Sequence, residues 1–178
     1  MRIISGSHKG RKLFAPKKLP VRPTTDRSKE ALFNFLHHRY DWTSIRALDL
    51  FSGTGGISYE FASRGVKEVY SVDVNSHCIK FIQQTAQKLD LKINTIKSDA
   101  LKYLSNINID FDLIFADPPY DKDYQSYLKL VNIIFENNKL KKNGLLIFEH
   151  PEQKYFEAHP KFSQARKYGS NIFSIFEE

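Results

Sequence analysis

The residues best suited to chemistry form the segment Asp117-Pro118-Pro119-Tyr120, which follows the apolar run 111–116. Its prolines fix φ and remove two backbone donors, so the Asp117 carboxylate and the Pro118 carbonyl are left as acceptors. Two acceptors facing one way suit an –NH₂ group, whose lone pair they direct toward an electrophile. The ring of Tyr120 offers a flat face for stacking a nucleobase. Taken alone, the tetrapeptide is equally compatible with a stiff turn at the end of a strand.

A glycine-rich turn at residues 51–56 follows a second apolar run and leads into a helical pattern. Glycines at the carboxyl edge of a sheet let the backbone approach a ligand closely. The turn lacks the Lys-Ser or Lys-Thr of a phosphate-binding loop, and its Gly-x-Gly-Gly spacing differs from the dinucleotide-binding Gly-x-Gly-x-x-Gly. A carboxylate at Asp49 repels pyrophosphate and attracts an ammonium group. The candidate cofactor-binding residues here are Asp49, Phe51, Ser52, Gly53, Thr54 and Gly55.

Two further carboxylates follow later strand-like runs. Asp73 ends the run 69–74, where a carboxylate can accept both ribose hydroxyls of an adenosine, although a plain turn residue is the alternative. Asp99, followed by Ala100, could accept from an adenine amine. Because Asp99 also precedes a helical pattern, capping of that helix is almost equally favoured.

Composition favours one domain over residues 1–178, since the chain is 41% hydrophobic and has no run of eighteen apolar residues. The amino terminus does not read as a signal peptide, so a cytoplasmic location is expected. The single cysteine, Cys78, excludes an internal disulfide and makes a cysteine-based metal cluster implausible. We expect it to lie on a helix as a small apolar residue.

The positive charge is concentrated in the first quarter of the chain. Residues 1–46 hold eleven Lys and Arg against three acids, a net charge of +8, so the remaining residues of this +7 chain carry −1. A near-neutral body with a basic amino-terminal extension over residues 1–45 is typical of a protein whose extension faces nucleic acid. The alternative is a lysine-rich surface that only contacts solvent.

Alternating apolar runs and helical patterns predict an α/β fold with helices on both faces of a mostly parallel sheet. We expect strands at 47–51, 69–74, 94–97, 113–116 and 145–149, and helices at 57–64, 76–89, 100–105 and 124–137, with Gly65 and Gly144 as breakers. Segments 162–167 and 172–176 predict a final antiparallel hairpin around residues 169–171. Residues 2–5 and 11–14 predict an amino-terminal hairpin, followed by a helix capped by Thr25 or Asp26.

The order of these motifs resembles the class I S-adenosylmethionine-dependent methyltransferases that act on exocyclic amines, whose sheet has seven strands. The segments Arg2-Ile3-Ile4-Ser5-Gly6, Gly10-Arg11-Lys12-Leu13 and Arg22-Pro23-Thr24-Thr25-Asp26-Arg27 are similar to a bacterial family that methylates a guanine 2-amino group in small-subunit (16S) ribosomal RNA. The resemblance extends from Arg2 to about His150. Ser52 and Ser58 stand where that family more often has Ala and Gly, and both are small enough to leave the loop intact.

The resemblance implies roles for individual residues. Asp117 and the Pro118 carbonyl would orient the amine beside Pro119, and Tyr120 would stack the base. Contacts with RNA phosphates are expected from Lys9, Arg11, Arg22 and Arg27, while Thr24 and Thr25 would help seat the target or cofactor. Glu149 is either an acceptor behind the pocket or a capping acid. Three histidines, His8, His37 and His38, have no partner at a recognisable spacing and are interpreted as surface or RNA-contact residues.

The sequence therefore predicts a monomeric, metal-independent enzyme that uses S-adenosylmethionine to methylate ribosomal RNA, free or in an assembling 30S particle. A DNA adenine or cytosine methyltransferase also uses Asp-Pro-Pro-Tyr, but it usually needs a target-reading insertion for which 178 residues leave no room. A non-catalytic RNA-binding module would need neither the glycine turn nor the Asp117 segment. An oxidoreductase is disfavoured by the spacing of the glycines.

Overall fold

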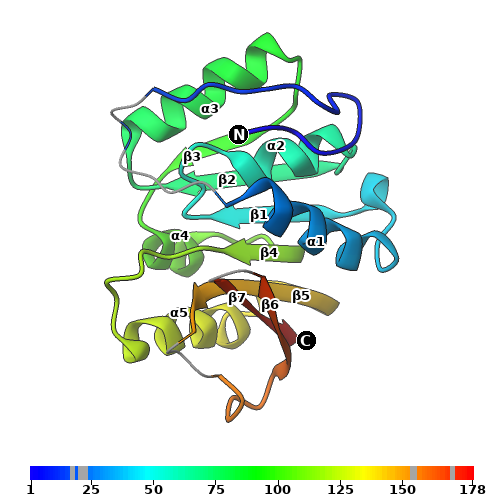
Figure 1. The fold of residues 1–178 in the computed structure, drawn as a ribbon. Helices are drawn as coiled ribbons and strands as arrows, with labels where there is room; N and C mark the ends of the chain where they lie inside the picture. The colour runs from blue at the N-terminus through cyan, green and yellow to red at the C-terminus, as the bar shows by residue number, and fades with distance from the viewer. Residues whose placement is uncertain (17–18, 20–23, 153–155, 169–170) are drawn as a thin grey trace.

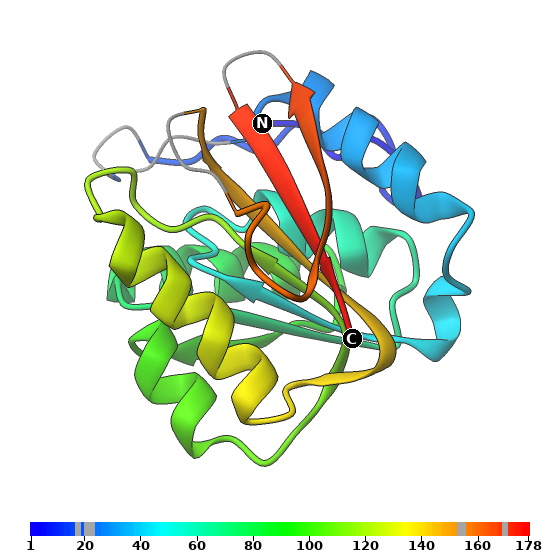
Figure 2. The same cartoon turned by 90° about the horizontal axis from the view of Figure 1, so that it is seen from below.

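The computed structural model describes residues 1–16, 19, 24–152, 156–168 and 171–178. Within these residues, seven strands form one sheet between two layers of helices (Figures 1 and 2). The helices are α1 (Asp26–His37), α2 (Gly56–Ser63), α3 (Ser76–Lys88), α4 (Ala100–Asn106) and α5 (Tyr124–Glu136), with a short 3-10 helix, η1 (Trp42–Ser44). The strands are β1 (Arg46–Leu50), β2 (Glu68–Asp73), β3 (Asn94–Lys97), β4 (Phe111–Ala116), β5 (Leu140–Pro151), β6 (Phe162–Tyr168) and β7 (Asn171–Glu177).

The strand order is β3-β2-β1-β4-β5-β7-β6. Strands β1 to β5 pair in parallel, whereas β7 pairs antiparallel with both β5 and β6. The predicted α/β fold with a terminal antiparallel hairpin is confirmed. Because the carboxyl ends of β1, β2 and β4 meet at one edge, this topology brings Asp49, Asp73 and Asp117 to the same side of the sheet.

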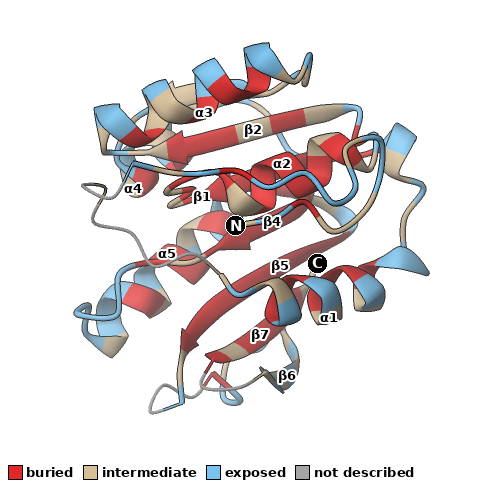
Figure 3. Ribbon diagram, turned by 45° about the horizontal axis from the view of Figure 1, so that its top comes forward, coloured by how far each residue is buried: buried red, intermediate tan, exposed pale blue. Residues whose placement is uncertain are grey.

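Each face of the sheet has its own hydrophobic core. On one face, Leu32 and Phe33 of α1 pack with Ile57 and Phe61 of α2, and on the other, α4 and α5 cover the sheet with a second cluster. The central strands are buried on both faces, as expected for parallel strands covered on each side (Figure 3). None of the helices in the described residues is long and apolar enough to cross a membrane.

Two predictions about the elements need correction. Gly144 does not break the chain before β5, because it lies inside that strand, in an irregular stretch where Leu140 to Leu145 of β5 stand opposite Phe111 to Leu113 of β4. Helix α5 ends at Glu136, with Asn137 as its C-cap and Asn138 at a φ of 50°. The expected amino-terminal hairpin has the predicted antiparallel course but only one isolated bridge, between Arg2 and Lys12.

We call residues 1–16 the N-terminal arm, and buried polar side chains fix it to the body. The Glu60 carboxylate of α2 accepts from the backbone N–H groups of Ile4 (2.8 Å) and Ser5 (3.0 Å). Lys29 of α1, 1% exposed, donates to the carbonyl of Arg2. Burial lowers the pKa of Lys29, an effect that the negative charge of Glu60 opposes. The arm is therefore part of the folded body.

The turn of the arm is fixed at the C-terminal end of α2. The backbone N–H of Ser7 donates to the Ser63 carbonyl (2.8 Å), and that of His8 donates to Ser63 Oγ (3.0 Å). Gly6 has a φ of +83°, and a Cβ on it would lie 1.8 Å from the Ser63 carbonyl oxygen. A side chain at position 6 would thus be excluded both by the backbone conformation and by contact with α2.

Candidate active site

A cavity of about 510 Å³ lies at the carboxyl edge of the sheet. It brings together the glycine-rich turn after β1, the end of β2, the segment after β4 and the ends of β5 and β7. Its lining includes every predicted residue of the catalytic set and six of the nine cofactor-binding candidates. The lining residues are Met1, Thr24, Asp49, Phe51, Ser52, Gly53, Thr54, Gly56, Ile57, Asp73, Val74, Asn75, Phe115, Asp117, Pro118, Pro119, Tyr120, Glu149 and Asn171.

The turn after β1 is held in an unusual backbone conformation. Phe51, Gly53 and Gly55 have φ values of 60°, 52° and 82°. For Phe51 this left-handed conformation carries a strain cost that commonly marks functional sites. Gly55, which precedes α2 and is not among the lining residues, has no room for a side chain, because a Cβ would lie 2.8 Å from Ile82 Cγ1. Phe51, Ser52, Gly53, Thr54 and Gly56 of the turn line the cavity, and ligand binding by this loop stays a prediction.

Asp49 is the buried carboxylate of the cavity, with 1% exposure. Its Oδ2 accepts from the backbone N–H of Ser58 at 3.0 Å and from Ser58 Oγ at 2.5 Å. Burial raises the pKa of Asp49 to about 7, although both Ser58 hydrogen bonds favour the ionised form. A cationic group placed beside Asp49 would stabilise its carboxylate form.

Asp73 has the turn role that the sequence allowed, and binding of ribose hydroxyls stays a prediction. Its Oδ2 accepts from the Gly53 N–H (2.8 Å) and its Oδ1 from the Asn75 N–H (2.8 Å), so it shapes the turn. Each carboxylate oxygen has a second lone pair with which it can accept from a ligand. The neighbouring Val74 lines the cavity with 67% of its surface exposed, which offers an apolar platform for a flat ring.

Asp99 and Ala100 are not among the residues that line the cavity. The Asp99 side chain caps α4 by accepting from the Lys102 N–H at 3.0 Å, and Ala100 is buried. The capping interpretation of Asp99 is therefore confirmed. A role for either residue in binding adenine stays a prediction.

The Asp117 segment is fixed by contacts on its backbone. The Asp117 N–H donates to the Leu50 carbonyl (3.4 Å), and Tyr127 Oη of α5 donates to the Pro119 carbonyl (2.9 Å). Within the described residues, the Pro118 carbonyl makes no hydrogen bond. Tyr120 is 36% exposed and lines the cavity. The segment therefore presents a carboxylate, a carbonyl oxygen and an aromatic ring to one space.

Glu149 at the end of β5 is buried behind Tyr120, with 1% exposure. Its Oε1 accepts from Tyr120 Oη (3.3 Å) and from the Asn171 amide, and its Oε2 accepts from Thr24 Oγ1 (3.3 Å). We call these four residues the Glu149 cluster. Glu149 is thus an acceptor behind the pocket, one of the two roles that the sequence allowed. Sequence reasoning missed Asn171, because its contact depends on the pairing of β5 with β7.

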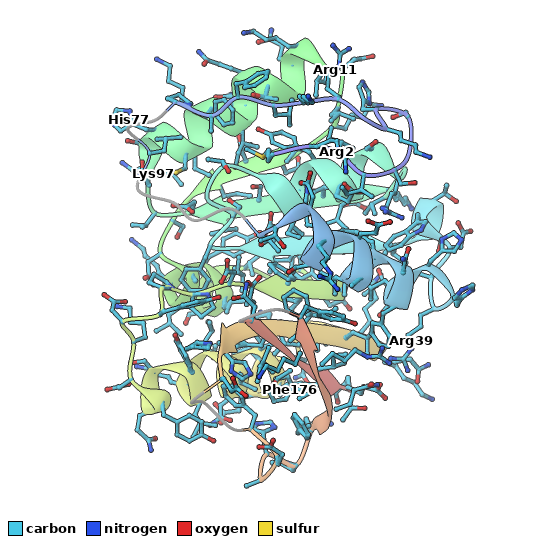
Figure 4. All side chains as sticks on the ribbon, viewed as in Figure 1. Arg2, Arg11, Arg39, His77, Lys97 and Phe176 are labelled. Atoms are coloured by element: carbon cyan, nitrogen blue, oxygen red, sulfur yellow. The ribbon has the colours of Figure 1, made fainter. Side chains whose placement is uncertain are left out.

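The candidate RNA-binding residues are distributed over different surfaces. Lys9 and Arg11 are exposed on the arm, where Arg11 lies at the opposite end of α3 from His77 (Figure 4). Arg27 is exposed on α1, as are His37 and His38 at its end. Thr24 lines the cavity, whereas Thr25 caps α1 by accepting from the Ser28 N–H (3.1 Å). Arg22 lies outside the described residues.

Comparison with named proteins supports one family. The profile of the family described as Conserved hypothetical protein 95 matches residues 1–177. A Bacillus subtilis protein named "Putative rRNA methyltransferase YlbH" is 35% identical over 158 residues, which cover 86% of this chain and 84% of that protein. The "Ribosomal RNA small subunit methyltransferase D" of Haemophilus influenzae is 32% identical over 160 residues, covering 86% and 80%.

Solved structures agree with this assignment. A Thermus thermophilus protein that is 25% identical superposes with a TM-score of 0.87 over 100% of this chain and 99% of that one. The 16S rRNA N2 G1207 methyltransferase of Thermus thermophilus, in complex with AdoMet and guanosine, shares the fold at 20% identity and a TM-score of 0.71, covering 87% of this chain and 44% of that one. The fold is the class I methyltransferase fold, and the chain belongs to the Conserved hypothetical protein 95 family.

Proposed function

We propose that this protein transfers a methyl group from S-adenosylmethionine to the 2-amino group of a guanine in small-subunit ribosomal RNA. The observation that carries the proposal is the shared cavity, in which the glycine-rich turn and the Asp117 segment face the same space. Relatives in the family are named as small-subunit rRNA methyltransferases. A neighbour of the same fold is a guanine N2 methyltransferase, so this fold is compatible with that target.

The cofactor is S-adenosylmethionine, and the residues around the turn fit its chemistry. Asp49 would hold the ammonium of the methionine part, and Asp73 would accept from the ribose hydroxyls. Val74 would contact a face of the adenine ring. When bound, the cofactor supplies an electrophilic methyl group on a sulfonium sulfur.

The chain's own residues would orient the nucleophile. Asp117 Oδ and the Pro118 carbonyl accept from the two N–H bonds of the guanine amine, while the ring of Tyr120 stacks on the base. As the nitrogen bonds to the methyl carbon, the bond between that carbon and the sulfonium sulfur would break and leave a neutral thioether. The surplus proton on the nitrogen would then be strongly acidic and leave to Asp117 or to water. Because no Lewis acid is needed for this step, we also propose that the enzyme does not depend on a metal ion. We further propose that it acts as a monomer.

The test is methylation of small-subunit rRNA, free and in 30S particles, from cells that lack this protein. We expect one N2-methylguanine to form, identified by mass spectrometry of the digested RNA, with activity unaffected by a chelator. Methylation of an adenine or cytosine amine would overturn the proposed target. Binding of NAD without binding of S-adenosylhomocysteine would overturn the methyltransferase assignment.

A further inference from the structure

The Glu149 cluster joins three segments that are distant in sequence. Thr24 precedes α1, Tyr120 belongs to the segment after β4, and Asn171 begins β7. Sequence separations between Glu149 and these donors are 125, 29 and 22 residues. A carboxyl group withdrawn from water requires hydrogen-bond donors, so burial of Glu149 depends on all three segments being in place.

The position of Tyr120 makes this dependence relevant to the reaction. The ring of Tyr120 lines the cavity and is 36% exposed, whereas its hydroxyl is bound to the buried Glu149. A phenol held at its oxygen keeps the direction of its Cγ–Oη axis, and because a phenol O–H prefers to lie in the plane of its ring, donation to a fixed acceptor also favours one ring plane. A stacking platform must keep this plane for the target amine to meet the Asp117 acceptors.

We infer that Glu149 is a positioning residue that orients Tyr120 for stacking and links this ring to the chain before α1. Its second oxygen accepts from Thr24, three residues before the exposed Arg27. The carboxyl group of Glu149 therefore contacts both the chain just before α1 and the tyrosine on which the target base would stack. Glu149 acts through Tyr120 and Thr24 and exchanges no proton with the substrate. This inference rests on the proposed function.

Two substitutions separate positioning from proton transfer. Glu149→Ala removes the acceptor for Thr24, Tyr120 and Asn171 and should lower kcat about ten- to a hundredfold, as displacement of a substrate-positioning group commonly does. Glu149→Gln keeps one oxygen for Tyr120 and Asn171, and its amide can donate to the Thr24 hydroxyl, so kcat should stay within about fivefold of wild type. If Gln is as damaging as Ala, Glu149 is not a positioning residue of this kind.

A double-mutant cycle tests whether Glu149 acts through Tyr120. Tyr120→Phe keeps the ring and removes the tethered hydroxyl. If the tether is the link, Glu149→Ala should lower kcat at least about threefold less in the Tyr120→Phe background than in the wild type. Affinity for target RNA without cofactor should show the same coupling. Independent, multiplicative effects on both measurements would overturn the inference.

Asp112→Ala is the matched structural control. Asp112 is a partly buried carboxylate at the amino end of β4, where its Oδ2 accepts from the Arg46 N–H and from Lys141 Nζ, both at 2.8 Å. We expect this variant to lower Tm and leave kcat unchanged. A wild-type enzyme that fails to methylate rRNA refutes the proposed function. An active wild type whose Glu149 and Tyr120 effects are independent refutes only the positioning role.

Discussion

The cavity has two halves that are built in different ways. In the half assigned to the cofactor, the hydrogen-bonding groups come from residues 49–75: Asp49 accepts from Ser58, and Asp73 accepts from Gly53 and Asn75. In the half assigned to the target base, the Glu149 cluster draws on segments that lie up to 125 residues from Glu149 in the sequence. A continuous stretch of chain forms the first half, whereas the second exists only after the whole sheet has assembled.

This difference predicts that substitutions can affect cofactor binding and the handling of the target RNA separately. Changes in the cofactor half should alter cofactor affinity, whereas changes in the target half should alter turnover or RNA binding. Variants that mix the two outcomes would show that the halves are coupled through the bound ligands.

The largest effect is expected at Asp117 in the target half. Asp117→Ala removes an acceptor that would hold the amine, so turnover should fall by a factor of about a hundred to a thousand. The Kd for S-adenosylhomocysteine, measured by calorimetry, should change little. Near wild-type turnover would show that Asp117 is only a turn residue.

Asp73 should show the opposite pattern. Asp73→Ala would remove the acceptor proposed for the ribose hydroxyls and the hydrogen bond to the Gly53 N–H, so the Kd for S-adenosylhomocysteine should rise about ten- to a hundredfold. The value of kcat at saturating cofactor should stay within a few-fold of wild type. An unchanged Kd would leave Asp73 with its role in the turn alone.

Replacement of cations on the arm and on α1 should weaken RNA binding and leave cofactor binding unchanged. Within the described residues, Lys9, Arg11 and Arg27 form no ion pair. Replacing these three residues and Arg22 with neutral residues should lower the slope of log affinity against log salt by about 0.7 to 0.9 for each phosphate that is no longer neutralised. The Kd for S-adenosylhomocysteine should not change. An unchanged RNA affinity and slope would place the RNA elsewhere on the body.

A matched set of cations lies near the carboxyl-terminal hairpin. Lys161, Lys167 and Arg39 pair with Glu178, Glu152 and Glu177 at 3.0, 2.6 and 2.9 Å. Because these charges are already neutralised by carboxylates, their replacement should have a much smaller effect on the salt slope. Equal effects of the two sets would mean that net charge alone controls RNA binding.

The smallest effect concerns pH in the cofactor half. The pKa of Asp49 is raised to about 7 by burial, so below pH 7 the neutral acid predominates in the ligand-free protein. Binding an ammonium would favour the carboxylate and release a proton, so cofactor affinity should fall as pH drops below 7, by at most about tenfold per pH unit. Calorimetry from pH 6 to 8 would detect this, and Asp49→Asn should remove it. A flat wild-type profile would contradict the assignment.

The two halves also differ in how well the sequence predicted them. The sequence could place Asp49, the glycine turn and Asp73 at the carboxyl edge of the sheet because strand ends and glycine spacing are local signals. All of these residues except Gly55 line one cavity. Asp117 to Tyr120 could be placed for the same reason. The partners of Glu149 could not, since they depend on the antiparallel pairing of β5 with β7 and on the path of the chain before α1.

The element boundaries show the same limit. Thr25, one of the two residues predicted as a cap, is the N-cap of α1, a position that could be predicted because capping is local. Gly144 was wrongly predicted as a breaker, because β5 already begins at Leu140 and holds Gly144 in the irregular stretch between its pairings with Phe111 and Leu113 of β4. Single-residue turn signals were overridden here by pairing across the sheet.

Gly6, which packs against Ser63, affects how an RNA substrate could lie on the enzyme. Because Gly6 allows the arm to pack directly on α2, the backbone N–H groups of Ser7 and His8 reach Ser63 and hold the basic turn at residues 8–11 to the C-terminal end of that helix. Helix α2 has eight residues and is therefore about 12 Å long, and its other end adjoins the cavity. If the turn binds RNA phosphates, the length of α2 would set a fixed distance between those phosphates and the modified nucleotide.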